Sequence, residues 1–325
     1  MSEISRILAA LEAHRGEPAA LATLVSVEGS SYRRPGARLL VLADGTRIGS
    51  ISGGCLEDDL RLHALRVLES GAAQLTEYDT TLENDLVWGV GLGCQGVVRV
   101  LVERLEANRP QWTSVLRENL AARRPTGLSV AYEAGAGTVL GTRLHEGDQG
   151  AGPRGVFTER VAPPPSLAVF GAGDDARPLV RLAKEVGWHV AVVDSRPAYA
   201  SRERFPEADR VVPEMAALEP GAFAVLMTHR YTEDVRLLRF LLSEPAAYVG
   251  VLGPRKRTER ILAELRQGGF SPPAEAMGRL YAPVGLDLGS TTPESIALSI
   301  LSEIQGRLGQ RDPIHLRDRT GPIYG

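Results

Sequence analysis

The stretch Val169-Phe170-Gly171-Ala172-Gly173-Asp174-Asp175-Ala176 decides the fold of the second half of this chain. It places the pattern G-x-G-x-x-A between an apolar run and a segment with helical periodicity, residues 175–186. Gly171 permits a tight turn, Gly173 lets backbone amides approach a pyrophosphate, and Ala176 allows a helix to pack closely on a strand. The pattern therefore predicts a Rossmann-like turn with a helix N-terminus aimed at phosphates.

The residues around this turn continue an alternation of strands and helices. The predicted strands are 167–170, 189–193, 222–227 and 248–252, and the predicted helices are 175–186, 232–242 and 293–308. Such alternation predicts an α/β fold with a doubly wound parallel sheet that is covered on both faces. Ligands of such sheets bind beyond the carboxyl ends of the strands, so the polar loops that follow the strands are expected to converge there.

Asp194 ends the second predicted strand of this half, where an acid binds the ribose hydroxyls of a dinucleotide. Arg196 follows two residues later, so the preference between NAD and NADP stays open. His229 fits a base, a ligand, a gate or a plain hydrogen-bonding side chain. The predicted nucleotide site, for NAD(P) or another adenine nucleotide, consists of Gly171, Ala172, Gly173, Asp175, Ala176, Asp194, Ser195, Arg196, Thr228, His229, Gly253 and Arg255. The alternative is a Rossmann fold whose pocket binds no nucleotide.

Three consecutive prolines, Pro163-Pro164-Pro165, mark the boundary between the two halves. Prolines stiffen a linker and interrupt both helices and central strands. We expect an N-terminal domain over 1–161, a linker over 162–166, a Rossmann-like domain over 167–309 and a tail over 310–325. The N-terminal half predicts an α+β domain with a mixed or antiparallel sheet. Its predicted helices are 4–14, 56–70 and 111–122, and its predicted strands are 19–27, 38–43, 46–48, 97–102, 128–132 and 138–144.

The composition of the chain limits the classes of protein to which it can belong. With 325 residues, 43% apolar residues and a net charge of −3, it is typical of a globular protein of two domains without a basic surface for nucleic acid. No run approaches the ~20 apolar residues that a membrane span needs. Two cysteines are too few for a disulfide framework, which predicts a cytoplasmic protein with reduced thiols. A homodimer is the default assembly.

Both cysteines lie in glycine-rich loops, Ser52-Gly53-Gly54-Cys55 and Gly93-Cys94-Gln95-Gly96. Glycine lets a backbone approach a ligand closely, so this placement suggests a metal, a sulfur-bearing cofactor or a redox pair. The alternative is two small residues that fill tight corners. The spacing excludes a zinc finger, and Cys55 with Cys94 alone would leave a metal under-ligated. What remains is a thiol pair, or single thiols, that face a ligand which brings its own chemistry.

A second polar loop, Gly29-Ser30-Ser31-Tyr32-Arg33-Arg34-Pro35-Gly36-Ala37-Arg38, lies between two predicted strands. Arginine suits phosphate and carboxylate groups because its guanidinium is a planar fork of donors. Cys55 directly precedes a predicted helix, which is a typical place for a reactive thiol, whereas the acids Glu57, Asp58 and Asp59 act against that effect. Because of its arginines and hydroxyl groups, the loop of residues 29–38 fits an anion site. The alternative is an ordinary surface connection between two strands.

Taken together, these motifs resemble the XdhC/CoxI family of xanthine dehydrogenase and carbon monoxide dehydrogenase accessory proteins. The N-terminal likeness runs through residues 29–38, 49–57 and 93–96. The C-terminal likeness covers Phe170-Gly-Ala-Gly173, Val193-Asp-Ser-Arg-Pro197, Arg204-Phe-Pro206, Met227-Thr-His229, Val251-Leu-Gly-Pro-Arg255 and Pro283-Val-Gly-Leu-Asp-Leu-Gly289. The chain departs from many relatives at Asp174, where they carry a histidine.

The resemblance implies a maturation factor without turnover of its own. Such a protein binds the molybdenum cofactor (molybdopterin), holds it during sulfuration, and delivers it to a molybdenum hydroxylase such as xanthine dehydrogenase. A cysteine desulfurase is the implied sulfur donor. The cofactor-binding residues that it implies are Ser30, Ser31, Arg33, Arg34, Ser52, Gly53, Gly54, Cys55, Cys94 and Gln95. The alternative function is an NAD(P)-dependent oxidoreductase that uses the Rossmann domain and the loop cysteines.

Overall fold

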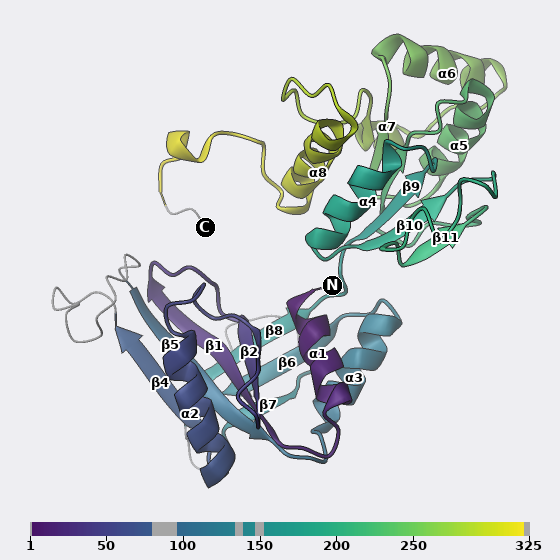
Figure 1. The fold of residues 1–325 in the computed structure, drawn as a ribbon. Coiled ribbons are helices and arrows are strands. Elements are labelled where there is room, and N and C mark those ends of the chain that lie inside the picture. The colour runs from purple at the N-terminus through teal and green to yellow at the C-terminus, as the bar shows by residue number, and fades with distance from the viewer. Residues whose placement is uncertain (1, 80–95, 134–138, 147–152, 322–325) are drawn as a thin grey trace. The chain divides into compact units, whose positions relative to one another are not determined.

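The structure, a computed structural model, describes residues 2–79, 96–133, 139–146 and 153–321. The chain divides into two compact units, Ser2–Pro163 and Pro164–Gly325, which we call the N-terminal and the C-terminal unit (Figure 1). Within the described residues, no helix combines the length and the apolar character needed to cross a bilayer.

The N-terminal unit is built on an antiparallel sheet with the strand order β3-β2-β1-β5-β4. Its strands are β1 (Ala19–Gly29), β2 (Arg38–Leu42), β3 (Arg47–Gly49), β4 (Gln74–Asp79) and β5 (Gly96–Leu105). A second antiparallel sheet has the order β7-β6-β8 and consists of β6 (Thr126–Ala131), β7 (Gly141–Leu144) and β8 (Val156–Val161). The predicted α+β architecture is thus found, with the antiparallel form of the sheet.

Helices cover both faces of the larger sheet, which is why β1 begins as an unbroken run of buried residues. On one face, α2 (Glu57–Ser70) packs through Leu60, Ala64 and Val67. On the other face lie α1 (Glu3–Ala13) and α3 (Gln111–Ala121). The helix α2 ends at Gly71, whose φ of 75° is the left-handed conformation that glycine adopts readily.

The C-terminal unit contains a parallel sheet with the order β11-β10-β9-β12-β13-β14. Numbered from the first strand of the unit, this is the order 3-2-1-4-5-6 of dinucleotide-binding folds. The strands are β9 (Ser166–Phe170), β10 (His189–Val193), β11 (Arg210–Val212), β12 (Phe223–Leu226), β13 (Tyr248–Val251) and β14 (Leu280–Tyr281). The strand order reverses between β9 and β12, and the glycine turn lies at this switch point, where β9 ends. The predicted Rossmann-like fold is therefore confirmed.

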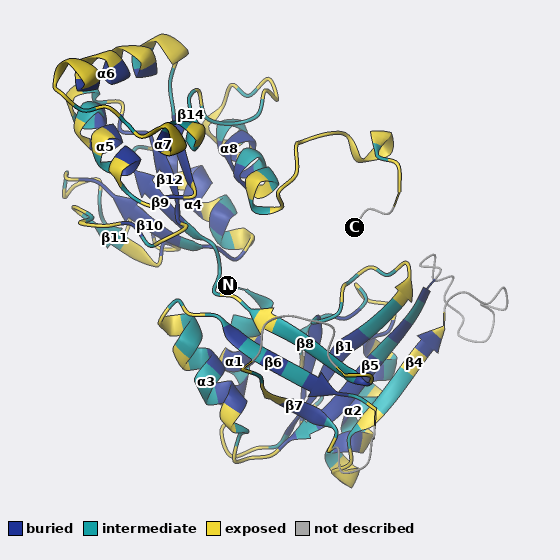
Figure 2. Ribbon diagram, turned by 180° about the vertical axis from the view of Figure 1, so that it is seen from behind, coloured by how far each residue is buried: buried dark blue, intermediate teal, exposed yellow. Residues whose placement is uncertain are grey.

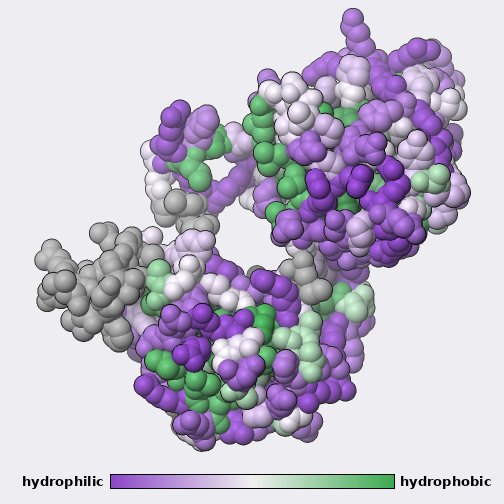
Figure 3. Space-filling model, in the orientation of Figure 1, coloured by the Kyte–Doolittle hydropathy of each residue, from purple (hydrophilic) through white to green (hydrophobic). Residues whose placement is uncertain are grey.

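Two helical layers enclose this sheet. One contains α4 (Ala176–Glu185) and α8 (Pro293–Leu308), and the other contains α5 (Tyr231–Ser243), α6 (Arg255–Gln267) and α7 (Ala274–Gly278). The strands are largely buried, whereas the helices expose their outer faces (Figure 2). The visible face of each unit is mostly hydrophilic, and hydrophobic residues show only in separate patches (Figure 3). A short 3-10 turn, Leu316–Asp318, lies in the tail.

Several elements were not predicted from the sequence. The strands β4 and β8 are polar and only partly buried, so they lack the apolar signal of a strand. The strands β11 and β14 are three and two residues long, too short for a recognisable pattern. The predicted strand 138–144 is shorter in the structure, where β7 begins at Gly141.

Candidate functional site

Two loops of the N-terminal unit contact each other. The Ser30 loop (residues 30–37) joins β1 to β2, and the Cys55 loop (residues 50–56) joins β3 to α2. The ring of Tyr32 lies against Gly53, where an added Cβ would be only 2.9 Å from the ring. Gly53 also has a φ of 95°, so both the space and the backbone favour glycine there. The structure thus brings together two segments that the sequence analysis singled out separately.

Glu57 holds the Cys55 loop in one conformation. Its Oε1 accepts hydrogen bonds from the Ser50 hydroxyl (2.8 Å) and from the amides of Ile51 (3.0 Å) and Ser52 (2.8 Å). Its Oε2 accepts from the Ser52 hydroxyl (2.6 Å) and from the amide of Gly54 (2.8 Å). A carboxylate offers about four lone-pair sites, so this loop fills the acceptor capacity of Glu57.

The hydrogen bonds also set the charge of Glu57. Burial by itself raises the pKa of this carboxyl, but the hydrogen bonds from Ser52, Ser50 and Ile51 outweigh burial and lower the pKa to about 2. Glu57 is therefore ionised at neutral pH. Its charge is stabilised by hydrogen bonds from the loop itself, and the Ser52 hydroxyl in turn accepts the amide of Leu56 at 2.9 Å.

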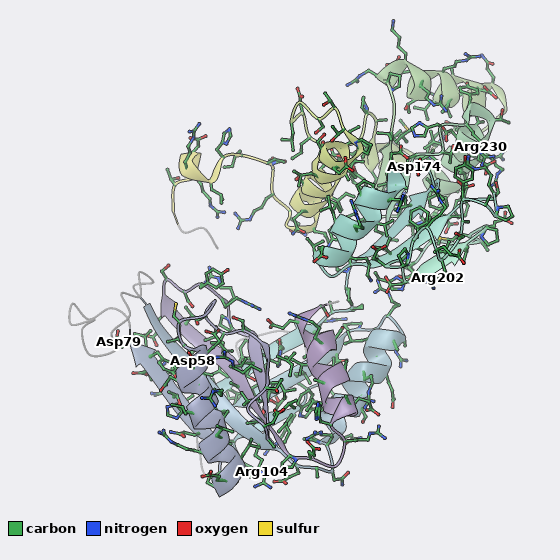
Figure 4. The ribbon with its side chains drawn as sticks, viewed as in Figure 1. Asp58, Asp79, Arg104, Asp174, Arg202 and Arg230 are labelled. Atoms are coloured by element: carbon green, nitrogen blue, oxygen red, sulfur yellow. The ribbon has the colours of Figure 1, made fainter. Side chains whose placement is uncertain are left out.

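Cys55 lies directly after this ordered segment as a free, exposed thiol. The two neighbouring acids of α2 are engaged elsewhere. Asp58 (Figure 4) pairs with Arg47 at 2.7 Å, and Asp59 accepts the hydroxyl of Tyr78 at 2.6 Å. Burial and the Asp59 carboxylate raise the pKa of Tyr78, which keeps this phenol protonated as a donor. The loop thus presents a thiol beside carboxylates that already have partners.

The Ser30 loop is anchored through Arg33. Both terminal nitrogens of this guanidinium bind the Glu3 carboxylate, at 3.0 to 3.1 Å, and Glu3 also accepts the amide of Arg38 at 3.3 Å. Arg34 is exposed in the same loop, as is Ser30, while Ser31 is half-buried. Arg33 thus fixes this loop to α1 through the Glu3 carboxylate.

Gly96, the last residue of the second cysteine motif, begins β5 and lies against the Ser30 loop. An added Cβ on Gly96 would lie 2.2 Å from the carbonyl oxygen of Ser30, so only glycine permits this approach. Cys94 and Gln95 themselves lie outside the described residues. Among the residues that are described, no group of three or more His, Cys, Asp or Glu side chains is arranged to hold a metal ion. The predicted Cys55–Cys94 metal pair therefore stays a prediction.

In the C-terminal unit, the glycine turn has the predicted place after β9. Gly171 has a φ of 115°, and an added Cβ would lie 2.5 Å from the carbonyl oxygen of Met227, at the end of β12. Its amide donates to the carbonyl of Val193 at 2.9 Å. Gly171 is therefore required by the close approach of three strand ends at the switch point, whether or not a ligand binds.

Asp194 follows β10, and its side chain is fully buried. Its Oδ1 accepts the amide (3.0 Å) and Nε (2.9 Å) of Arg196, and its Oδ2 accepts Nη2 of Arg196 (2.7 Å) and the amide of Ala172 (2.9 Å). Burial raises the pKa of Asp194, but these hydrogen bonds outweigh it and lower the pKa to about 2. The carboxylate thus ties the glycine turn to the loop after β10.

Two further acids of the turn have basic partners. Asp175 lies 2.6 Å from Nε2 of His229, a contact between the loops that follow β9 and β12. His229 has a φ of 59°, a conformation uncommon for a side chain with a Cβ. Asp174 pairs with Arg204 at 2.8 Å. The Oδ1 atom of Asp175 also lies 2.7 Å from the position of a Cβ on Gly173, in the space over the turn.

The remaining predicted nucleotide residues differ in their surroundings. Thr228 is buried and hydrogen-bonds to Asp234, which also binds Arg257 at 2.6 Å. Ala176 is buried in the core, as close packing of α4 on the sheet requires. Ser195 and Arg255 are exposed after β10 and at the start of α6. Gly253 has a φ of 128° in the loop after β13.

Sequence reasoning missed Glu57 and Tyr32 as parts of the N-terminal site, and Arg204 and Arg230 as parts of the C-terminal one. Arg230, labelled in Figure 4, comes from the loop after β12. It donates to the Ser195 hydroxyl at 3.3 Å and lies 3.9 Å from Asp194. The available signal for Arg230 was its place in a polar loop directly after a strand. For Glu57, the only signal in the sequence was its position two residues after the Gly-Gly-Cys stretch, which placed it next to the Cys55 loop.

Comparisons with known proteins cover almost the whole chain. Residues 12–79 match the XdhC and CoxI family, and residues 167–304 match the XdhC Rossmann domain. A curated protein of Bacillus subtilis (strain 168), named as a probable subunit of xanthine dehydrogenase, is 35% identical over 89% of this chain and 92% of its own length. The molybdenum cofactor insertion chaperone PaoD of Escherichia coli (strain K12) is 26% identical over 91% of this chain and 86% of its own.

A solved structure gives the same result for the fold. The crystal structure described as a xanthine dehydrogenase from Bacillus halodurans is 32% identical, with a TM-score of 0.80. The match covers 96% of this chain and 97% of that one.

Proposed function

This chain belongs to the XdhC and CoxI family, and from that premise we propose that it binds the molybdenum cofactor and takes part in the maturation of a molybdenum hydroxylase of the xanthine dehydrogenase type. In this proposal it holds the cofactor while the terminal sulfido ligand is installed, and then delivers it. A cysteine desulfurase supplies the sulfur. The relatives named for xanthine dehydrogenase and for cofactor insertion support the role.

The observation that carries the proposal is the contact between the Ser30 loop and the Cys55 loop. It sets an exposed thiol, two serines and an exposed arginine on neighbouring loops of one unit. Molybdopterin carries a phosphate and a dithiolene-bound metal, and these are the two chemical features that such a set can hold.

We assign the phosphate to Arg34, Ser30 and Ser31, because arginine and hydroxyl donors suit a phosphate. Arg33 is assigned the positioning of the loop, because Glu3 already holds its guanidinium. Cys55 faces the metal end of the cargo, and Cys94 completes the same pocket. Gly53 and Gly54 let the backbone approach the cargo, and Glu57 fixes Ser52 and Gly54, which precede Cys55, in place.

The proposal is tested by activation of a cofactor-free molybdenum hydroxylase. The full chain is loaded with molybdenum cofactor, treated with a cysteine desulfurase and L-cysteine, and mixed with the hydroxylase. We expect more hydroxylase activity per molybdenum than free cofactor gives, and less from Cys55→Ala. Activation no better than free cofactor contradicts the proposal.

The thiols are tested separately from the overall role. If Cys55→Ala and Cys94→Ala both retain full cofactor binding and full activation, the cysteines are structural and the shared pocket is wrong. The alternative function, an NAD(P)-dependent oxidoreductase, predicts a change in nicotinamide absorbance when candidate substrates are added.

A further inference from the structure

The basic residues around Asp194 form a second candidate site, which the cofactor role does not use. We propose that the C-terminal unit binds an adenine dinucleotide that carries a 2′-phosphate, in preference to one that lacks it. The site is the loop after β10 with Ser195 and Arg196, joined by Arg230 from the loop after β12. This inference does not rest on the proposed function.

The first step is that Asp194 has no acceptor left for a ribose. In dinucleotide-binding folds, the acid at this place accepts the ribose 2′-hydroxyl of NAD. Here both carboxylate oxygens accept two hydrogen bonds each, all from Ala172 and Arg196. A carboxylate offers about four such positions, so a hydroxyl would have to displace one of these donors. The carboxylate oxygens that would normally select NAD are therefore already occupied.

The second step is that the surface beyond Asp194 is basic. Arg196 lies with its guanidinium 3.8 Å from the centre of the Tyr199 ring, a contact that holds the side chain in one orientation. Nε and Nη2 of Arg196 bind Asp194, which leaves Nη1 for a ligand. Arg230 donates to the exposed Ser195 hydroxyl. Two guanidinium groups and a hydroxyl are the donors that a phosphate dianion takes.

The third step is that the cluster has unused donors. The Nε atoms of Arg204 and Arg230 are buried and have no hydrogen-bond partner among the described residues. Buried donors without a partner are uncommon in folded proteins. A phosphate at this edge would bring an acceptor to Arg230, whose printed partners are the Ser195 hydroxyl at 3.3 Å and the Asp194 carboxylate at 3.9 Å.

The acids of the glycine turn do not decide the preference. Asp174 and Asp175 disfavour a pyrophosphate, but NAD and NADP share that group and lose affinity equally. The ratio of the two affinities therefore isolates the contribution of the 2′-phosphate. Because the contact is electrostatic and partly exposed, the preference should shrink as salt is added.

The test is calorimetric titration of the full chain with NADP⁺ and with NAD⁺, at low and at physiological salt. Adenosine 2′,5′-bisphosphate and adenosine 5′-monophosphate serve as minimal probes of the same difference. We expect the 2′-phosphorylated ligand to bind about tenfold more tightly or better, the effect of one or two charge-assisted contacts. Equal affinities, tighter binding of NAD⁺, or no binding of either ligand would overturn the proposal.

The matched variants are Arg230→Gln and Arg236→Gln. Arg230 lies at the site, whereas Arg236 is an arginine of α5 paired with Glu233 and Glu214. We expect Arg230→Gln to bring the affinity ratio close to one and Arg236→Gln to leave it unchanged. Equal melting temperatures confirm that both variants fold. A ratio unaffected by Arg230→Gln contradicts the assignment of the site.

Discussion

Glu57 is the single residue on which the order of the Cys55 loop most depends. In Glu57→Gln, the side-chain NH₂ group would face amide and hydroxyl donors where a carboxylate oxygen now accepts them. We expect the free energy of unfolding to fall by about 1–3 kcal/mol, because several partly buried hydrogen bonds lose their acceptor. Urea denaturation measures this loss, with Asp58→Asn as the control because Asp58 is exposed and pairs with Arg47 at the surface.

The same carboxyl predicts a pH dependence. Its pKa is about 2 in the folded chain and 4.5 ordinarily, so folding favours the ionised form. The stabilisation from Glu57 is complete above about pH 4.5 and is lost as the pH falls towards 2. The stability difference between wild type and Glu57→Gln should thus be constant between pH 7 and 5.5 and shrink in more acidic solution. A difference that grows on acidification would contradict this assignment.

Gly53 and Gly54 separate the effect of the Tyr32 contact from that of backbone strain. Both have a positive φ, but an added Cβ meets the Tyr32 ring at Gly53 and nothing within 4 Å at Gly54. We expect Gly53→Ala to lower stability by about 0.5–1 kcal/mol more than Gly54→Ala, because the exposed Tyr32 ring must leave its preferred position. Equal losses in thermal unfolding would show that the two loops do not depend on this contact.

At the scale of elements, Gly171 joins three strand ends of the Rossmann sheet. A Cβ there would lie 2.5 Å from the backbone of Met227, which cannot move without shifting β12. We expect Gly171→Ala to cost about 3 kcal/mol or more, whereas Gly221→Ala, with positive φ but open space, should cost about 1 kcal/mol. Differential scanning calorimetry compares the two variants. Similar melting temperatures would contradict the account.

The elements that could be predicted from the sequence are those with a strong local pattern. The stripe Leu60, Ala64 and Val67 with Gly71 predicted α2, and the apolar runs around the glycine turn predicted the parallel sheet. The polar strand β4 was missed because its partner β5 is distant in the sequence and most of its side chains are not buried.

The candidate sites were less accessible to prediction than the fold. The sequence placed Asp194 at the end of its strand, but it could not show that Arg196 and Ala172 fill its acceptors. The role of Glu57 depends on a backbone that folds back over it, and the Tyr32–Gly53 contact joins loops 21 residues apart. These are tertiary contacts, which local propensity does not encode.

At the scale of the whole molecule, the apolar residues form separate cores in the two units. We therefore expect two unfolding transitions in calorimetry, with Gly53→Ala shifting one and Gly171→Ala shifting the other. The variants serve as controls for each other, because each lies in only one of the two units. A single transition that both variants shift equally would show that the units unfold together.

The central claim is that the N-terminal loops hold the molybdenum cofactor, and the most direct test is the molybdenum that the protein retains. Purified full chain is titrated with cofactor released from a donor enzyme, passed through gel filtration, and assayed for molybdenum by elemental analysis. Cys55→Ala is compared with Ser70→Ala, a change of similar size at the far end of α2. We predict near-stoichiometric molybdenum on wild type and Ser70→Ala, and a clear loss on Cys55→Ala. Wild-type protein that retains no molybdenum would contradict the claim.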